Sequence, residues 1–216
     1  MNPAIFRARF VLFDWDGTLL NSYTADARAY LAMFRALQIK WDVKEINRHY
    51  SPDWYQVYRA AGIPRGKWAC ADRLWQLAYR LERPELLPGA RTLLRALKGK
   101  FALAVVTGGS RARVRRQIRE FGLAGHFSTC VCSEDAYRKK PHPAPLRLAM
   151  KRLQARPEEC VYIGDAPQDV EMARRAGVSV IGVLGPFPTA RRIRAARPDL
   201  LLQSIRELPA YLTPLD

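Results

Sequence analysis

Residues 10–22 of the chain read FVLFDWDGTLLNS, and this stretch decides the fold. Residues 10–13 form an apolar run with aromatic and β-branched members, which is typical of a buried strand. Two acids, Asp14 and Asp16, follow at once, and Gly17 then allows the chain to turn. The sequence therefore predicts two carboxylates at the carboxyl end of a buried strand, where α/β sheets bind their ligands. Such neighbouring carboxylates repel each other unless a cation lies between them, which indicates a metal site.

The composition is that of a folded protein of ordinary size. The 216 residues suit one large domain or one domain with an insert, and 49% of them are apolar. No apolar run approaches the roughly 18–20 residues that a transmembrane helix needs, and residues 1–17 lack the features of a signal peptide. Four scattered cysteines favour a reducing compartment over a disulfide framework. We therefore expect a cytoplasmic protein with no membrane partner.

The net charge of +16 is large and raises the question of a nucleic-acid partner. Residues 90–119 contain nine Lys or Arg residues and no acid, so the basic excess is concentrated there. In the segment 111–121 the apolar residues recur every three to four positions, which predicts a helix with its arginines on the solvent face. We interpret the charge as a solvated basic surface. Attraction of an anionic substrate ranks second, and nucleic-acid binding ranks last.

Residues 21–87 read as a small helical domain. The segment contains four of the five tryptophans and no convincing strand pattern. We expect this domain to be inserted into a core that comprises residues 1–20 and 88–216. Helices are predicted over residues 21–37, 43–61 and 65–82, with a break at residues 62–64, Gly-Ile-Pro.

After residue 88, helical and strand patterns alternate. Strands that alternate with helices of about ten residues predict right-handed βαβ units and a parallel sheet. The predicted fold class is therefore α/β, with a Rossmann-like parallel sheet core and an inserted α-helical cap domain. Strands are predicted at 101–106, 127–132, 160–163, 178–183 and 199–202, and helices at 91–97, 111–121, 145–153, 167–176, 189–196 and 205–212.

Chemically capable side chains recur just after successive predicted strands. Because the carboxyl ends of parallel strands open on one edge of a sheet, we expect these side chains to converge on one site. Clustered carboxylates without His or Cys suit a hard cation, Mg²⁺ above all. Mg²⁺ together with a lysine is suited to handling phosphate. The residues are Asp14 and Asp16 after the first strand, Thr107 after the second, Lys140 after the third, and Asp165 and Asp169 after the fourth.

This set of residues supports a two-step phosphoryl transfer. An aspartate can attack phosphorus and form an aspartyl phosphate, which water then hydrolyses. A second carboxylate two residues further on can give a proton to the leaving oxygen and later take one from water. Asp14 and Asp16 have this spacing.

The order of elements resembles the haloacid dehalogenase superfamily of phosphohydrolases over nearly the whole chain. Each of the four motifs of that superfamily is weak to moderate evidence alone. All four occur here in the expected order, each after its own predicted strand, which makes the resemblance specific. They are DWDGT at 14–18, VVTG at 105–108, KPHP at 140–143 and GDAPQD at 164–169.

The resemblance implies a role for each acidic residue of the motifs. Asp14 would be the nucleophile and a metal ligand. Asp16 would be the general acid and base, with its backbone carbonyl on the metal. Asp165 would bind Mg²⁺, and Asp169 would support the metal site or orient the motif lysine.

The resemblance also implies residues that bind phosphate and substrate. Thr107 and the N–H of Gly108 would hold phosphoryl oxygens, and Lys140 would balance charge on the nucleophile and the phosphate. Residues 48–51, Arg-His-Tyr-Ser, lie where relatives carry a loop that contacts the substrate. Arg48 and His49 are therefore candidate substrate-binding residues, although the glycine that relatives often carry there is missing.

Two details narrow the type of enzyme. Asp16 argues against a dehalogenase, which needs no proton donor at this position, and against phosphonate hydrolysis, for which the family has a small residue there. Thr107 lies 93 positions after Asp14, with the helical insert between them. This arrangement resembles the type that includes phosphoglycolate phosphatase and β-phosphoglucomutase, in which a helical cap closes over the substrate.

The sequence thus predicts a Mg²⁺-dependent phosphatase that acts on a small phosphorylated metabolite through an aspartyl phosphate, as a monomer or homodimer. The main alternative is a β-phosphoglucomutase-like phosphomutase, which would share every core residue. A phospho-receiver domain ranks low, because its phosphorylated aspartate follows the third strand and no cap is inserted. A nucleic-acid-binding protein is the remaining alternative, suggested by the charge alone.

Overall fold

A computed structural model describes residues 5–51 and 53–215 of the chain, which form two compact units. The first unit comprises the described residues of 1–20 and 86–216, and the second comprises those of Asn21–Glu85. The short strands β3 (Leu20–Asn21) and β4 (Glu85–Leu86) pair with each other where the chain passes between the units. The roles of core and cap for these units stay predictions.

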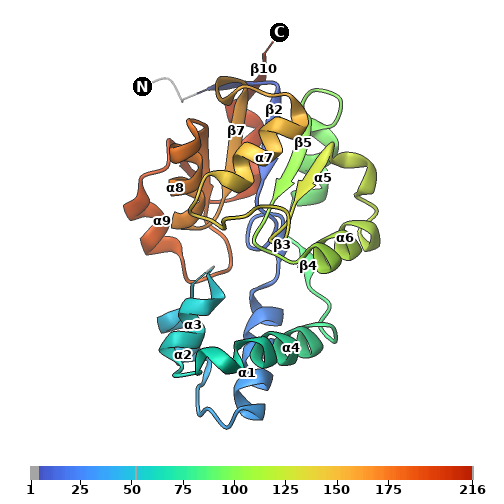
Figure 1. Cartoon of the computed structure of the whole chain (residues 1–216). Coiled ribbons are helices and arrows are strands. Elements are labelled where there is room, and N and C mark those ends of the chain that lie inside the picture. The colour runs from blue at the N-terminus through green and yellow to red at the C-terminus, as the bar shows by residue number, and fades with distance from the viewer. Residues whose placement is uncertain (1–4, 52, 216) are drawn as a thin grey trace. The chain divides into compact units, whose positions relative to one another are not determined.

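A six-stranded parallel sheet forms the centre of the first unit (Figure 1). β2 lies between β5 and β7, so the strand that leads into the acidic motif is a central one. All pairings in this sheet are parallel, and the predicted α/β class is confirmed. The order is β6 (Thr129–Val131), β5 (Ala102–Val106), β2 (Phe10–Phe13), β7 (Cys160–Gly164), β8 (Ser179–Val183) and β9 (Leu200–Leu202).

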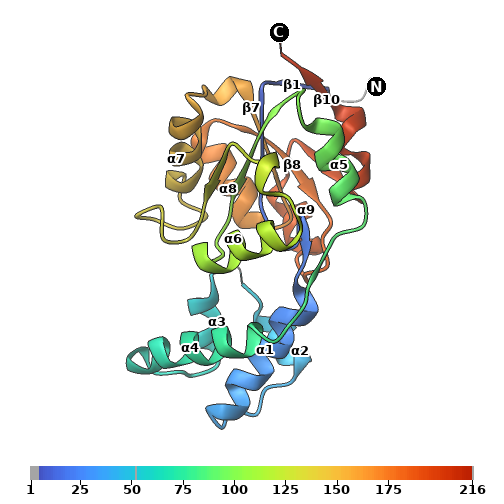
Figure 2. The same ribbon diagram turned by 90° about the vertical axis from the view of Figure 1, so that its right-hand side faces the viewer.

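Helical segments cover both faces of this sheet, as Figures 1 and 2 show together. Successive side chains of a strand point to opposite faces, so Val11 enters the core on one face and Leu12 the core on the other. Strands buried on both faces need continuous apolar runs, which explains the sequence of β2. The first face is covered by α5 (Ala90–Leu97), α6 (Arg111–Glu120) and η4 (Ile205–Tyr211), and the second by α7 (Ala144–Leu153), α8 (Pro167–Ala176) and α9 (Ala190–Ala196).

The two ends of the described chain pair with each other in the first unit. β1 (Phe6–Ala8) and β10 (Leu212–Pro214) form a parallel two-stranded sheet, which is absent from the strands predicted from the sequence. The predicted helix at 205–212 is a 3₁₀ helix, η4, with Pro209 inside it. Proline lacks the N–H that a regular α-helix would need at this position. Short 3₁₀ turns also occur at η2 (Ala124–His126) and η3 (Pro157–Glu159).

The second unit is built from helices around its own apolar core. Aromatic and aliphatic side chains, among them Phe34, Val57 and Tyr58, are fully buried there. Within the described part of the chain, no helix has both the length and the apolarity that crossing a membrane requires. The elements are α1 (Tyr23–Ala36), α2 (Val43–His49), α3 (Trp54–Ala60), η1 (Arg65–Lys67) and α4 (Trp68–Tyr79).

The prediction of one helix over residues 43–61 is wrong. α2 ends at His49 and α3 begins at Trp54. Ser51 precedes a proline in the sequence, which disfavours helical backbone at Ser51. The carboxylate of Asp53 then accepts the N–H of Tyr55 at 3.2 Å, which caps the new helix.

Packing at the sheet centre can be tested with Leu12, which is fully buried on β2. We predict that Leu12→Ala lowers the free energy of unfolding by about 2–5 kcal/mol, because it leaves a cavity under α7 and α8. The matched change Leu81→Ala removes a side chain that is 81% exposed and should alter stability by less than about 0.5 kcal/mol. Urea unfolding followed by circular dichroism measures both, and equal losses would contradict this packing.

Candidate active site

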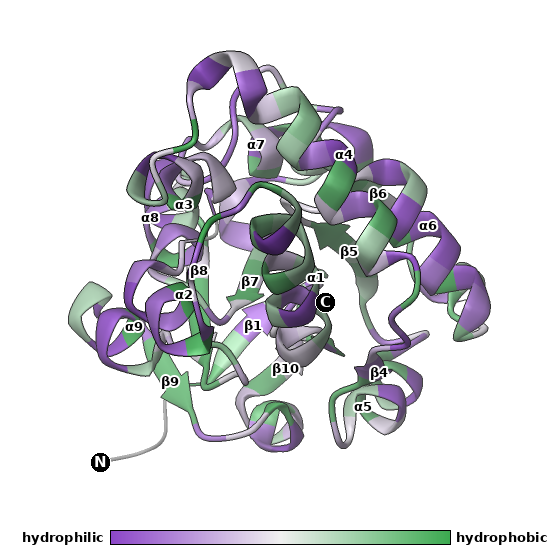
Figure 3. Cartoon of the chain, turned by 90° about the horizontal axis from the view of Figure 1, so that it is seen from below, coloured by the Kyte–Doolittle hydropathy of each residue, from purple (hydrophilic) through white to green (hydrophobic). Residues whose placement is uncertain are grey.

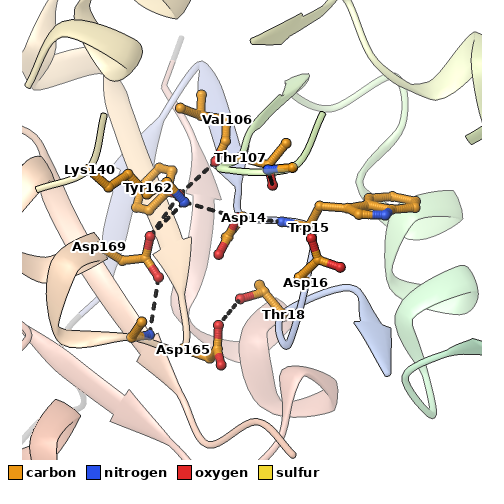
Figure 4. A network of polar contacts seen from close by, with 12 residues as sticks. Asp14, Trp15, Asp16, Thr18, Val106, Thr107, Lys140, Tyr162, Asp165 and Asp169 are labelled. Carbon is orange, nitrogen blue, oxygen red and sulfur yellow. Dashed lines mark hydrogen bonds and ion pairs between the residues drawn. The ribbon is translucent and has the colours of Figure 1, made fainter. Parts of the chain in front are cut away.

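The sheet topology brings the site residues of the four motifs to one edge of the first unit. β2 lies between β5 and β7, so Asp14 emerges between Thr107, which follows β5, and Asp165, which follows β7. Lys140 comes from the segment between β6 and α7, and Asp169 from the first turn of α8. Figure 4 shows these side chains together with their polar contacts.

Lys140 is the cation among the carboxylates. Its Nζ lies 2.9 Å from a carboxylate oxygen of Asp14 and 2.7 Å from one of Asp169. It also donates to the hydroxyl of Tyr162 at 2.8 Å. Burial lowers the pKa of Lys140, but the charges of Asp14 and Asp169 outweigh this effect and leave the pKa above its ordinary value. Lys140 is therefore held as an ammonium ion.

Asp14 is a buried carboxylate at the end of β2. Burial raises its pKa to about 7, while the charge of Lys140 opposes this shift and that of Asp169 reinforces it. One of its oxygens accepts the N–H of Trp15 at 2.7 Å. The side chain is thus fixed in direction and lies next to a cation, as a nucleophilic carboxylate requires.

Three carboxylates could hold a metal ion. One oxygen from each of Asp14, Asp165 and Asp169 lies within 4.8 Å of the others. Burial raises the pKa of Asp165 well above its ordinary value, and the charges of Asp14 and Asp169 raise it further. A bound cation would remove this electrostatic cost. A donor set made only of oxygens suits a hard divalent cation, so the residues fit such a metal.

The contacts of Asp169 favour an orienting role. One oxygen pairs with Lys140, and the other accepts the N–H of Ala166 at 3.1 Å. The hydroxyl of Tyr162 accepts from Lys140 and donates to the carbonyl oxygen of Val106 at 2.9 Å. Tyr162 was not among the predicted site residues, because a tyrosine inside an apolar strand is typical of a core position.

Thr107 and Gly108 form a turn directly after β5. The Oγ1 of Thr107 accepts the N–H of Gly109 at 3.0 Å, which leaves the hydroxyl proton available for donation. A Cβ atom at Gly108 would meet no atom within 4 Å, so the space beside its backbone is open. Both features fit the predicted binding of phosphoryl oxygens, which stays a prediction.

Two glycines let the loops of the first and fourth motifs approach each other. Gly17 has a φ of +80°, and a Cβ atom there would overlap the carboxylate of Asp165. Gly185, which follows β8, lies so near the carbonyl oxygen of Gly17 that it also has no room for a Cβ. The sequence motif identified Gly17, whereas no motif marks Gly185.

Asp16 forms a separate ion pair with Arg113 of α6. The guanidinium Nη1 and Nη2 lie 2.8 Å and 2.6 Å from the two carboxylate oxygens. The Arg113 side chain is only 13% exposed, so the prediction that the arginines of this helix lie on the solvent face is wrong for Arg113. Periodicity could not reveal a partner 97 positions away.

Arg48 and His49 belong to the second unit, whereas the carboxylate cluster belongs to the first. Both lie at the end of α2 in the second unit, where they pair with Glu45 at 3.0 Å and 3.7 Å. The His49 ring stacks on Trp41 with 5.0 Å between centroids. Their predicted contact with substrate stays a prediction.

A family model for haloacid dehalogenase-like hydrolases matches residues 11–183, which include all four motifs. The chain belongs to this family. The match confirms the resemblance inferred from the motifs, and with it the prediction of a hydrolase of the phosphatase type. The Rossmann-like core is likewise confirmed.

Similar proteins carry related activities in their names. Pyrophosphatase PpaX of Bacillus velezensis is 27% identical over 207 residues, which cover 94% of this chain and 95% of that protein. Phosphoglycolate phosphatase of Escherichia coli is 31% identical over 131 residues, which cover 60% of this chain and 52% of that protein. The crystal structure of CbbY from Rhodobacter sphaeroides in complex with phosphate is 26% identical, with a TM-score of 0.79 over 93% of this chain and 96% of that one.

Bringing three carboxylates together in a buried site should lower the free energy of unfolding of the metal-free protein. The folded-state pKa of Asp165 is raised, so its ionisation removes stability as pH rises above about 4. We therefore predict that Asp165→Asn stabilises the metal-free protein, and by more at about pH 8 than at about pH 5. The same variant should lose the stabilisation by MgCl₂, which reaches about 2.7 kcal/mol at one hundred times the dissociation constant.

Thermal unfolding in EDTA and in MgCl₂ at both pH values measures these effects. Glu158→Gln is the control, since this carboxylate is 65% exposed and lies outside the cluster. It should leave the response to MgCl₂ as in the wild type. A destabilised Asp165→Asn variant that still responds to MgCl₂ would contradict the proposed cation site.

Proposed function

We propose that the protein is a Mg²⁺-dependent phosphatase that hydrolyses a small phosphomonoester through an aspartyl phosphate on Asp14. The observation that carries this proposal is the contact of Asp14 with Lys140 beside two further buried carboxylates. A carboxylate held next to an ammonium group, in a site with room for a divalent cation, can approach a phosphate dianion without net repulsion. The family match supports the same chemistry.

The reaction would proceed in two steps. An oxygen of Asp14 forms a bond to phosphorus while the bond to the leaving oxygen breaks, and the leaving oxygen takes a proton from Asp16. Water then attacks the phosphorus of the aspartyl phosphate, Asp16 takes a proton from this water, and Asp14 leaves as a carboxylate. The products are an alcohol and inorganic phosphate.

The remaining residues of the motifs would hold the phosphoryl group. The hydroxyl of Thr107, the N–H of Gly108 and the ammonium of Lys140 are donors for its oxygens, where negative charge develops during transfer. Lys140 already donates to Asp14, Asp169 and Tyr162, which uses all three of its N–H bonds. Its charge is therefore held in place before substrate binds, and a hydrogen bond to a phosphoryl oxygen would replace one of these three contacts.

The carboxylate cluster would hold the Mg²⁺ ion. Its ligands would be Asp14, Asp165 and the backbone carbonyl of Asp16, with Asp169 behind them. When bound, the ion supplies positive charge beside the nucleophile and the phosphoryl oxygens.

The substrate is proposed to be a small phosphorylated metabolite of the kind that phosphoglycolate phosphatase hydrolyses. Residues 21–87 would act as the cap, with Arg48 and His49 as candidate contacts to the leaving group. The relative PpaX is named a pyrophosphatase, so pyrophosphate belongs in any substrate panel. We place the protein in the cytoplasm, which suits its four free thiols.

Phosphate release from p-nitrophenyl phosphate, pyrophosphate, phosphoglycolate and other small phosphate esters tests this proposal. We predict turnover that requires Mg²⁺, is abolished by EDTA, and falls at least about a thousandfold in Asp14→Asn, since the amide cannot attack phosphorus. The Glu158→Gln variant should keep wild-type rates.

The outcomes separate the proposal from its alternatives. Turnover that survives Asp14→Asn would exclude Asp14 as the nucleophile. Activity that appears only with a sugar bisphosphate as activator, and that isomerises a sugar phosphate, would identify a phosphomutase. Absence of turnover with all substrates and activators would overturn the proposed function.

A further inference from the structure

The ion pair between Arg113 and Asp16 uses both oxygens of the carboxylate. The two N–O distances are 2.8 Å and 2.6 Å, one from each terminal nitrogen of the guanidinium. This is the paired geometry in which arginine binds a carboxylate most strongly. With side-chain exposures of 13% for Arg113 and 24% for Asp16, the pair is partly shielded from water. It should therefore be stronger than an ordinary surface ion pair.

The surrounding residues are arranged to accommodate the Arg113 side chain. A Cβ atom at Gly109 would overlap the guanidinium, so the glycine leaves room for the Arg113 side chain. The Oε1 of Gln117 lies 3.4 Å from Nη1 of Arg113 and accepts the indole N–H of Trp15 at 3.0 Å. Trp15 stands between the two acids of the first motif. The contacts thus connect α6 to the motif at two successive residues, Trp15 and Asp16.

The ion pair with Arg113 also directs the Asp16 carboxylate away from Lys140, which balances the charge of Asp14. In Figure 4, Lys140 and Asp16 lie on opposite sides of Asp14. The contacts agree, since Lys140 pairs with Asp14 and Asp169 while Asp16 pairs with Arg113. Both oxygens of Asp16 accept from the guanidinium, so the carboxylate is held against α6. Turning it away from α6 toward a leaving group would break at least one of these two hydrogen bonds.

We propose that Arg113 is a positioning residue that restrains Asp16 against α6 and thereby sets the leaving-group preference of the enzyme. Some substrates, such as aryl phosphates and phosphoanhydrides, have a leaving group that departs as a stable anion and needs no proton. The restraint on Asp16 does not slow their hydrolysis. Alkyl phosphates need a proton from Asp16, so the ion pair with Arg113 slows their hydrolysis. This inference rests on the proposed phosphatase function and deepens it, because it connects the rate at which alkyl phosphates, the class that includes phosphoglycolate, are hydrolysed to a named contact.

The test compares kcat/KM for alkyl phosphates with kcat/KM for p-nitrophenyl phosphate. We predict that Arg113→Met raises the alkyl-to-aryl ratio at least fivefold over wild type, because Asp16 is released. Arg113→Lys, which keeps the charge but cannot form the paired contact, should raise the ratio as well and serves if the Met variant fails to fold. Arg119→Met is the matched control, since Arg119 is an exposed residue of the same helix, and it should leave the ratio unchanged.

The same substitutions in an Asp16→Asn background show whether Arg113 acts through Asp16. The ratio should then no longer respond to Arg113→Met or Arg113→Lys, whereas a merely structural role of Arg113 would change both backgrounds alike. A ratio that stays constant or falls in the Arg113 variants, while the wild type remains active, overturns this inference and leaves the phosphatase function intact. A wild type inactive toward every phosphate overturns both.

Discussion

The placement of one lysine among buried carboxylates is the constraint on which the rest of the site depends. Asp14, Asp165 and Asp169 carry three negative charges when ionised, and Lys140 supplies one positive charge, so two negative charges remain. Burial makes this excess costly, as the raised pKa values of Asp14 and Asp165 show. A divalent cation would balance the charge.

The parallel sheet makes this concentration of charge possible. Its strands are apolar on both faces, so polar groups can gather only where the strands end. Because β2 is flanked by β5 and β7 in register, the residues that follow these strands come together without any long loop. Gly17 then allows the first loop to pass the carboxylate of Asp165 at a distance that any side chain would prevent. The glycine of the first motif and the aspartate of the fourth are therefore parts of one arrangement.

Much of this arrangement could be predicted from the sequence, and the rest depends on contacts between distant residues. Apolar runs gave the strands of the large sheet, and polar residues after them gave the cluster. The break between α2 and α3 was missed because periodicity continues across it, although Ser51 before a proline was a usable signal. β1 and β10 have three residues each and lie near opposite ends of the sequence, so no local pattern predicts that they pair. Tyr162 and Gly185 act through neighbours that only the fold supplies.

Helix α6 shows why net charge is a poor guide to what an arginine does. It is strongly hydrophilic (Figure 3), and Arg111, Arg115 and Arg119 are exposed as periodicity predicts. Arg113 lies in the same arginine-rich segment. Its side chain nevertheless turns inward, because Gly109 leaves room for it and Asp16 offers two carboxylate oxygens. A solvated basic surface and a partly buried ion pair thus share one helix. What each arginine does depends on the group that it contacts. For Arg113 that group is 97 positions away in the sequence, so the fold and not the helix determines the contact.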